Sequence, residues 1–254
     1  MDDTEPDRVV RRRTPTATLR RPGEEGSDAA APVVRTLYER CGKRACDILG
    51  AAVLLIPAAP LLVLAALGVL AVLGRPVLFR QVRTGRDGRP FVLLKLRSLR
   101  EGAGEDAARM TRFGRALRAS ALDELPQLLN VLRGEMSLVG PRPLPPDYDA
   151  LYTPAEAARL RVRPGLCGLA QAAGRNALPW NTRLALDAHY ARTRQSLGRD
   201  LGLILLCAWV LLRGIGASAP DCATMRPLTA ERGPGAQPVQ VAPRLRIVAE
   251  RGRD

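Results

Sequence analysis

From Ile48 to Gly74 the sequence reads ILGAAVLLIPAAPLLVLAALGVLAVLG, an apolar stretch without a charged side chain. A helix over it would be roughly 40 Å long at ~1.5 Å per residue, and roughly 30 Å is enough to cross the apolar core of a bilayer. Pro57 and Pro60 lie near its middle. A proline inside a helix lacks a hydrogen-bond donor and crowds the preceding turn. We therefore expect the helix to break or bend sharply at the two prolines.

Basic side chains lie on both sides of this stretch. Because the flanks have the same sign, the positive-inside rule favours neither orientation. Matching flanks favour a helical hairpin that enters the membrane, turns at the prolines and leaves by the same face. A single span with a proline kink is the alternative. The flanking residues are Arg40, Lys43 and Arg44 before the stretch, and Arg75, Arg80, Arg83 and Arg86 after it.

The membrane anchor is expected to comprise Lys43, Arg44, Asp47, Pro57 and Pro60. A carboxylate at the start of an apolar segment is costly unless it is paired. Lys43 and Asp47 are four residues apart, so they can pair on one helix face. This spacing predicts a structural role for Asp47.

Around the anchor, composition divides the 254 residues into four parts. We predict a disordered arm over residues 1–34, a re-entrant hairpin over 35–75, a catalytic domain over 76–225 and a disordered basic tail over 226–254. The expected fold class is α+β and mainly helical, with a re-entrant helix–break–helix and a small cytoplasmic domain. That domain should contain interfacial helices and a β-hairpin, with strands over residues 76–82 and 90–98 and a turn at 85–88. Helices are expected over residues 111–118, 155–162, 184–194 and 201–212.

The segment from Ser120 to Pro143 carries the candidate chemistry. It contains the adjacent acids Asp123 and Glu124, and Arg142 lies between two prolines. Because Pro126 suits the first turn of a helix, we place Asp123 at or near a helix N-cap, where the positive helix end would keep both acids ionised. Paired acids beside an arginine fork suit metal-assisted phosphoryl chemistry. Taken alone, the acid pair is more typical of a capped surface helix followed by a turn than of a catalytic site.

The net charge of +14 indicates an anionic partner: a nucleic acid, an anionic lipid or a phosphorylated substrate. Aromatic residues make up only 4% of the chain, which disfavours nucleic-acid binding by base stacking. The five cysteines show no metal-ligand spacing, and His189 is the only histidine of the chain. Acid–base and nucleophilic work would therefore fall to carboxylates.

In motif order and spacing, residues 43–225 resemble the bacterial sugar transferases, the small monotopic phosphoglycosyl transferases that load a sugar phosphate onto a polyprenyl phosphate. Ala59 and Glu135 depart from the family pattern, which has Ser and Asp at these positions. The resemblance is carried by Lys43-Arg44 with Asp47, Arg83-x-Gly85-x-x-Gly88-x-Pro90-Phe91, Lys95-x-Arg97-Ser98, Asp123-Glu124-Leu-Pro-Gln127-Leu-x-Asn130, Val139-Gly140-Pro141-Arg142-Pro143, Arg163-Pro164-Gly165-x-x-Gly168-x-Ala-Gln171, Gly174-Arg175-Asn176 and Asp187-x-x-Tyr190.

The resemblance implies an enzyme on the cytoplasmic face of a bacterial plasma membrane, embedded in one leaflet. Asp123 would attack a UDP-sugar, release UMP and pass the sugar phosphate to polyprenyl (undecaprenyl) phosphate, as the first membrane step of glycan assembly. Glu124 would act with it and bind Mg²⁺. The partners would be UDP-sugar, polyprenyl phosphate and the bilayer, without nucleic acid. Substrate or phosphate contacts are assigned to Lys95, Arg97, Asn130, Arg142, Gln171 and Arg175.

Two other hypotheses stay open at this point. A membrane-tethered basic protein that binds nucleic acid or anionic lipid without catalysis would explain the charge, but not the spaced glycines and prolines. A single-pass membrane protein with a cytosolic enzymatic domain differs from the hairpin only in topology. It would place residues 1–40 and 75–254 on opposite sides of the membrane.

Overall fold

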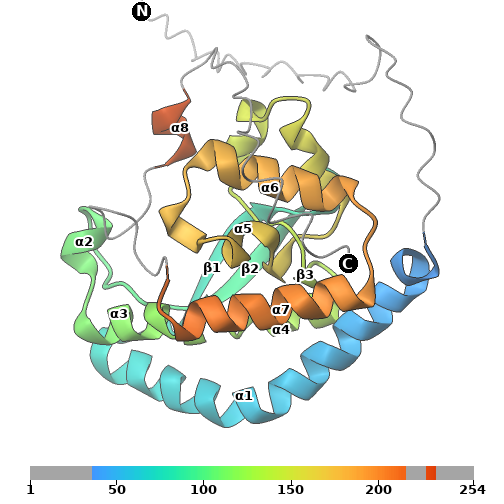
Figure 1. Ribbon diagram of the computed structural model, residues 1–254. Helices are drawn as coiled ribbons and strands as arrows, with labels where there is room; N and C mark the ends of the chain where they lie inside the picture. Colours follow the sequence, from blue (N-terminus) through green and yellow to red (C-terminus); the bar gives the residue numbers. More distant parts are fainter. Residues whose placement is uncertain (1–35, 216–226, 233–254) are drawn as a thin grey trace, which may run out of the picture. The chain divides into compact units, whose positions relative to one another are not determined.

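The computed structural model describes residues 36–215 and 227–232, all within one compact unit that begins at Arg35. This unit is mainly helical, as predicted, and contains two small sheets, of which only the hairpin was predicted (Figure 1). The strands are β1 (Leu78–Thr84), β2 (Pro90–Leu96), β3 (Ser137–Val139) and β4 (Gly165–Cys167). The α-helices are α1 (Lys43–Leu73), α2 (Asp106–Arg109), α3 (Arg112–Ala119), α4 (Gln127–Arg133), α5 (Leu169–Ala172), α6 (Trp180–Arg192), α7 (Leu197–Leu212) and α8 (Leu228–Glu231). A π-helical turn, η1 (Tyr38–Gly42), precedes α1, and short 3₁₀ helices are η2 (Arg86–Gly88), η3 (Leu122–Glu124), η4 (Pro146–Leu151), η5 (Glu156–Arg161) and η6 (Arg175–Ala177).

The long helix α1 continues through Pro57 and Pro60 without interruption and bends along its length (Figure 1). The predicted break is therefore wrong. The two prolines are three residues apart and lie on one side of the helix, so the lost hydrogen bonds curve it rather than end it. Within the described residues, the helical segment Tyr38–Leu73 is the one long and apolar enough to cross a membrane. Whether α1 re-enters the membrane stays a prediction.

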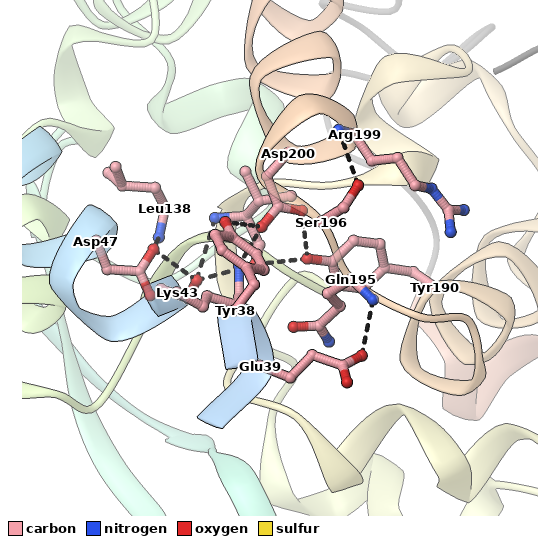
Figure 2. A network of polar contacts seen from close by, with 12 residues as sticks. Tyr38, Glu39, Lys43, Asp47, Leu138, Tyr190, Gln195, Ser196, Arg199 and Asp200 are labelled. Carbon is pink, nitrogen blue, oxygen red and sulfur yellow. Dashed lines mark hydrogen bonds and ion pairs between the residues drawn. The ribbon is translucent and has the colours of Figure 1, made fainter. Parts of the chain in front are cut away.

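The start of α1 is attached to the domain by two buried acids (Figure 2). Asp47 accepts hydrogen bonds from the hydroxyl of Ser137 and the backbone N–H of Leu138, both at 2.9 Å. Lys43 instead pairs with Asp200 at the start of α7, with 2.7 Å between Nζ and Oδ2. The predicted pair between Lys43 and Asp47 is therefore wrong, because each side chain has a partner on another element. Asp47 does anchor α1, as expected.

The end of α1 is attached to the same domain by Arg97, which follows β2. Its guanidinium is buried and donates to the backbone carbonyls of Leu73, Gly74 and Arg75. The last carbonyls of a helix lack partners within the helix, so the arginine satisfies groups that would otherwise need water. Both ends of α1 thus contact one folded domain.

The predicted hairpin is confirmed as the antiparallel pair β1 and β2, joined by a turn at residues 85–89. Its buried side chains pack against α4. Asn130 of α4 is fully buried and joins the two elements. It accepts from the N–H of Leu94 at 3.1 Å and donates to the carbonyl of Val92 at 2.8 Å. This packing fixes the segment just before α4 against the hairpin.

The second half of the domain differs from prediction in its details. The helix expected over residues 184–194 begins earlier, as α6 at Trp180, and the helix expected over 155–162 is the 3₁₀ helix η5. The predicted apolar helix is α7, which packs on β3, β4 and α5. It leaves Leu205 71% and Trp209 52% exposed, so it is not a core helix. An interfacial position, the other alternative, fits this exposure.

The predicted terminal segments fall mostly outside the described residues. The arm over residues 1–34 lies wholly outside them. Of the tail predicted over 226–254, residues 227–232 comprise α8 with its N-cap Pro227 and its C-cap Arg232, and Leu228 packs on the domain. For these six residues the prediction of a disordered tail is wrong, because Leu228 finds a buried apolar site that the local composition does not reveal.

Candidate active site

The two acids lie in η3, a short turn between α3 and α4. Helix α4 begins only at Gln127 after its N-cap Pro126, so the expected position of Asp123 at a helix N-cap is wrong. The turn is entered through Ala121, which has a left-handed backbone with φ of 55°. A non-glycine residue in this region stores about 1–3 kcal/mol of strain and tends to occur where function requires it. The surrounding structure, rather than a helix cap, therefore holds the pair in place and offsets the strain at Ala121.

Glu124 is held by two cations. Its Oε1 lies 2.7 Å from Nζ of Lys95 and 2.7 Å from Nη2 of Arg142, and its Oε2 lies 3.5 Å from Nη1 of Arg142. Burial opposes ionisation, but Arg142 and Lys95 together outweigh it and keep the pKa of Glu124 well below its usual range. Glu124 is thus a fixed negative charge.

Asp123 has the opposite environment. Its side chain is buried, and within the described part of the chain its carboxylate makes no hydrogen bond or ion pair. Burial, followed by the charge of Glu124, raises the pKa of Asp123 to about 6, although Lys95, Arg118 and Arg142 act against this rise. The helix end that was expected to keep Asp123 ionised is therefore absent, and the pKa of Asp123 is raised rather than lowered. At neutral pH it is an ionised carboxylate with free oxygens, which is what a nucleophile requires.

Asp123 faces an open cavity of about 1280 Å³. The cavity follows β1 from Val77 and Leu78, near the end of α1, toward Arg83, Tyr148 and the start of α6. Its lining is rich in cations, which suits a ligand with several phosphate charges. The cations are Arg80, Arg83, Lys95, Arg97, Arg100, Arg109, Arg118, Arg142 and Arg183.

Of the residues predicted to contact substrate or phosphate, some line the cavity and others lie behind its wall. Lys95, Arg97 and Arg142 line the cavity, but Arg97 is engaged with the end of α1. Asn130 lies behind it and holds α4 on β2. Gln171 and Arg175 do not line it, although polar atoms of both side chains are buried without a hydrogen-bond partner. Substrate contact by these residues stays a prediction.

The carboxylates of the site can hold Mg²⁺ only together with a substrate. Within residues 36–215 and 227–232 no group of three or more His, Cys, Asp or Glu side chains could hold a metal alone. Mg²⁺ is commonly held by one or two carboxylates together with substrate phosphates. The free carboxylate of Asp123 and the weakly engaged Oε2 of Glu124 fit that arrangement.

Sequence reasoning missed the far wall of the cavity. The guanidinium of Arg183 lies over the ring of Trp180, 4.6 Å from its centroid, and the ring of Tyr148 meets Trp180 edge to face at 5.6 Å. All three residues line the cavity. The spacing of Trp180 and Arg183 by three residues on a helix was a usable signal, whereas the contribution of Tyr148 depends on the fold.

Arg142 is itself supported by a buried pair. Arg159 donates to the backbone carbonyl of Arg142 and, at 2.9 Å, to Oδ2 of Asp187 on α6. Burial raises the pKa of Asp187, and Arg159 opposes that rise. The backbone of Arg142 is therefore held by Arg159 of η5, which is in turn paired with Asp187 of α6.

Comparisons with known proteins identify relatives of this chain. A family model described as bacterial sugar transferase matches residues 38–214. A UDP-glucose:undecaprenyl-phosphate glucose-1-phosphate transferase of Caulobacter vibrioides is 48% identical over 180 residues, covering 64% of this chain and 67% of that protein. The uncharacterized sugar transferase EpsL of Bacillus subtilis is 50% identical over 124 residues, covering 46% and 61%. The exopolysaccharide production protein ExoY of Rhizobium meliloti is 40% identical over 185 residues, covering 64% and 81%.

Proposed function

This chain belongs to the bacterial sugar transferase family, and from that premise we propose that it transfers a sugar 1-phosphate from a UDP-sugar to undecaprenyl phosphate. The named activities of its relatives in Caulobacter vibrioides and Salmonella typhimurium, a glucose-1-phosphate transferase and a galactose phosphotransferase, both use undecaprenyl phosphate. The relatives named for exopolysaccharide production support a role in the first membrane step of glycan assembly.

The first half of the reaction is assigned to Asp123. An oxygen of its carboxylate attacks the sugar-bearing phosphorus of the donor, and the bond from that phosphorus to the bridging oxygen breaks. The electron pair leaves with UMP, and the sugar phosphate becomes an acyl phosphate of Asp123. The pKa of about 6 leaves Asp123 ionised at neutral pH while keeping its basicity higher than that of an ordinary aspartate, which favours attack.

The second half returns Asp123 to its starting state. A phosphate oxygen of undecaprenyl phosphate attacks the same phosphorus, the bond to Asp123 breaks, and the carboxylate leaves with the electron pair. The product is a polyprenyl diphosphate sugar. A covalent relay lets a water-soluble donor and a membrane-bound acceptor use the site in turn.

Glu124 is assigned to Mg²⁺ together with the donor phosphates, and the metal would neutralise charge on the diphosphate. Lys95 and Arg142 hold Glu124 in place and add positive potential at the same point. Negative charge that gathers on the leaving UMP is stabilised by cations fixed in advance of the reaction.

One observation carries this proposal. Asp123 faces a basic cavity, and its carboxylate has no hydrogen-bond partner among the described residues. The adjacent residue, Glu124, is held by two cations. The test measures UMP release from a UDP-sugar with undecaprenyl phosphate and Mg²⁺. Asp123→Asn keeps the shape of the side chain and should abolish release. Full activity in that variant would refute the assignment, and wild-type protein that releases no UMP from any UDP-sugar of a broad panel would refute the function.

We also propose that α1 enters and leaves one leaflet of the bilayer from the cytoplasmic face. Both of its ends contact the same domain, Asp47 through Ser137 and Leu138 and the C-terminal carbonyls through Arg97. A helix that crossed the bilayer would carry its ends to opposite sides. The apolar side chains exposed along α1, among them Ile56 at 75% and Leu64 at 66%, then meet lipid.

Single cysteines introduced into a cysteine-free chain test this topology. Cysteines at residues 5 and 240 should both resist a membrane-impermeant maleimide in intact cells and both react after lysis. Labelling of residue 5 alone from outside would support the single-span alternative and contradict re-entry.

A further inference from the structure

Helix α8 lies beyond residue 214, where the family match ends, yet it is tightly bound to the domain. Leu228 is 0% exposed and packs in a cluster with Leu144, Trp180 and Leu184. Arg232, which follows the helix, is also buried and forms a two-pronged ion pair with Glu156. The distances are 2.7 Å from Nη1 to Oε2 and 2.8 Å from Nη2 to Oε1. A buried two-pronged pair of this kind fixes orientation as well as position.

Glu156, the partner of Arg232, is held in a fixed orientation by Thr153. Oε2 of Glu156 accepts from the backbone N–H and the hydroxyl of Thr153, both at 3.0 Å. The guanidinium of Arg232 also donates to the carbonyl of Leu151 at 3.3 Å and to the side chain of Asn181 on α6. Arg232 therefore ties together the end of η4, the start of η5 and the start of α6.

Helix α8 packs on the side of Tyr148 and Trp180 that faces away from the cavity. The backbone N–H of Leu228 donates to the phenol oxygen of Tyr148 at 3.2 Å, and the side chain of Leu228 packs against Trp180. Tyr148 and Trp180 meet edge to face, and both line the cavity together with Arg183. The contacts thus run from α8 through the two rings to the guanidinium of Arg183.

This end of the cavity has the chemistry of a nucleotide site. The polar-edged rings of Tyr148 and Trp180 lie here with the guanidiniums of Arg83 and Arg183, whereas the end nearest α1 adds the apolar side chains of Val77, Leu78 and Phe79 to its own arginines. At ~3.3 Å per residue the two ends of β1 are roughly 20 Å apart. The end with the apolar side chains suits the lipid acceptor, so the end with Tyr148 and Trp180 is left for the soluble donor.

We propose that residues 227–232 form a latch that positions Tyr148 and Trp180 for the nucleotide portion of the donor, with Leu228 and Arg232 as its positioning residues. This inference rests on the proposed function and adds to it a donor site whose wall is completed from outside the family region. Loosening the latch weakens donor binding and leaves the chemistry at Asp123 unchanged, since among the described residues the contacts of α8 and Arg232 end at Tyr148 and Glu156 and their neighbours rather than at Asp123.

The test uses the full chain in membrane vesicles and measures UMP release while each substrate is varied in turn. Leu228→Ala and Arg232→Gln should each raise the KM for the UDP-sugar about tenfold, with kcat and the KM for undecaprenyl phosphate within about twofold of wild type. Arg232→Lys keeps the positive charge but cannot form the bidentate ion pair with Glu156, so its KM for the UDP-sugar should lie between those of wild type and Arg232→Gln. Thr229→Ala, at an exposed position of the same helix, is the matched control and should behave as wild type.

Thermal unfolding of each variant shows whether the whole domain has lost stability. The intermediate donor KM expected for Arg232→Lys shows whether the ion pair with Glu156 matters in a folded protein. Wild-type donor KM in both Leu228→Ala and Arg232→Gln would overturn the latch, as would equal changes in the KM values of donor and acceptor. Failure of the proposed function is a different result, because wild-type protein would then release no UMP. In that case equilibrium dialysis with UDP tests the latch alone: equal affinities of wild type and Arg232→Gln would overturn it.

Discussion

Replacing Glu124 with glutamine separates the roles of the two acids, because it removes a charge and almost no volume. The pKa of Asp123 lies at about 6 against an ordinary value of 3.8, a difference of about 2 units. That difference corresponds to about 3 kcal/mol of disfavoured ionisation. Burial is the larger cause and the charge of Glu124 the next. A neighbouring like charge shifts a pKa by roughly one unit or more, so Glu124→Gln should lower the pKa of Asp123 to about 5 or below.

The assay is the pH dependence of kcat/KM for UMP release, which reports the ionisation of the free enzyme. In the wild type the ionised fraction of Asp123 rises with pH through about 6, so kcat/KM should rise over that range and level off above it. In Glu124→Gln the maximum should be lower and the inflection should move to lower pH. Lys95→Met removes a cation that favours the ionised form, so its inflection should move to higher pH. Inflections that stay at the wild-type pH in both variants would refute the reasoning.

Three further predictions concern the domain around the site. Asp123→Asn should raise the free energy of unfolding by up to about 3 kcal/mol at pH 7. The gain should shrink as the pH falls through about 6 and vanish below about pH 3, where the wild-type aspartate is protonated in both states, as chemical denaturation can measure. Asp47→Ala removes the acceptor of two buried hydrogen bonds and should lower the free energy of unfolding by about 2–4 kcal/mol in the same assay; a change below about 0.5 kcal/mol would contradict the anchoring role. Arg142→Lys keeps the charge but not the fork, so steady-state kinetics should show kcat/KM reduced about tenfold or more, and unchanged kinetics would contradict the role of the fork.

Local signals in the sequence were enough to locate several elements. The hairpin β1–β2 follows from alternating side chains around a glycine-bounded turn, and α3 follows from Thr111, whose hydroxyl accepts from the N–H of Gly114 at its start. These features depend on neighbours within a few residues. The proline effect was overestimated in α1, where the helical bonds on either side of Pro57 and Pro60 persist.

Partners distant in sequence could not be predicted in the same way. Lys43 has an acid four residues away, yet it pairs with Asp200, 157 residues away, because the fold brings the start of α7 against the start of α1 (Figure 2). Likewise, the N-cap expected for Asp123 rested on Pro126 alone. The strained backbone at Ala121 and the cations that surround Glu124 come from the tertiary structure.

The assigned residues also account for part of the basic charge of the chain. Cations from β1, β2, α3 and α6 gather around one cavity rather than forming a uniform surface. A binding protein for nucleic acid or anionic lipid would need the charge but not the buried acid pair. The acid pair and its two cations are thus the feature that favours catalysis over binding alone.

The central claim is that Asp123 carries the sugar phosphate between the two substrates. The most direct measurement is mass spectrometry of the protein after it is mixed with a UDP-sugar and Mg²⁺ without undecaprenyl phosphate, followed by digestion in acid. We expect the peptide that contains Asp123 to gain the mass of one sugar phosphate, to lose it when undecaprenyl phosphate is added, and to show no gain in Asp123→Asn. Stoichiometric UMP release with no adduct on that peptide, or an adduct that persists in Asp123→Asn, would contradict the account.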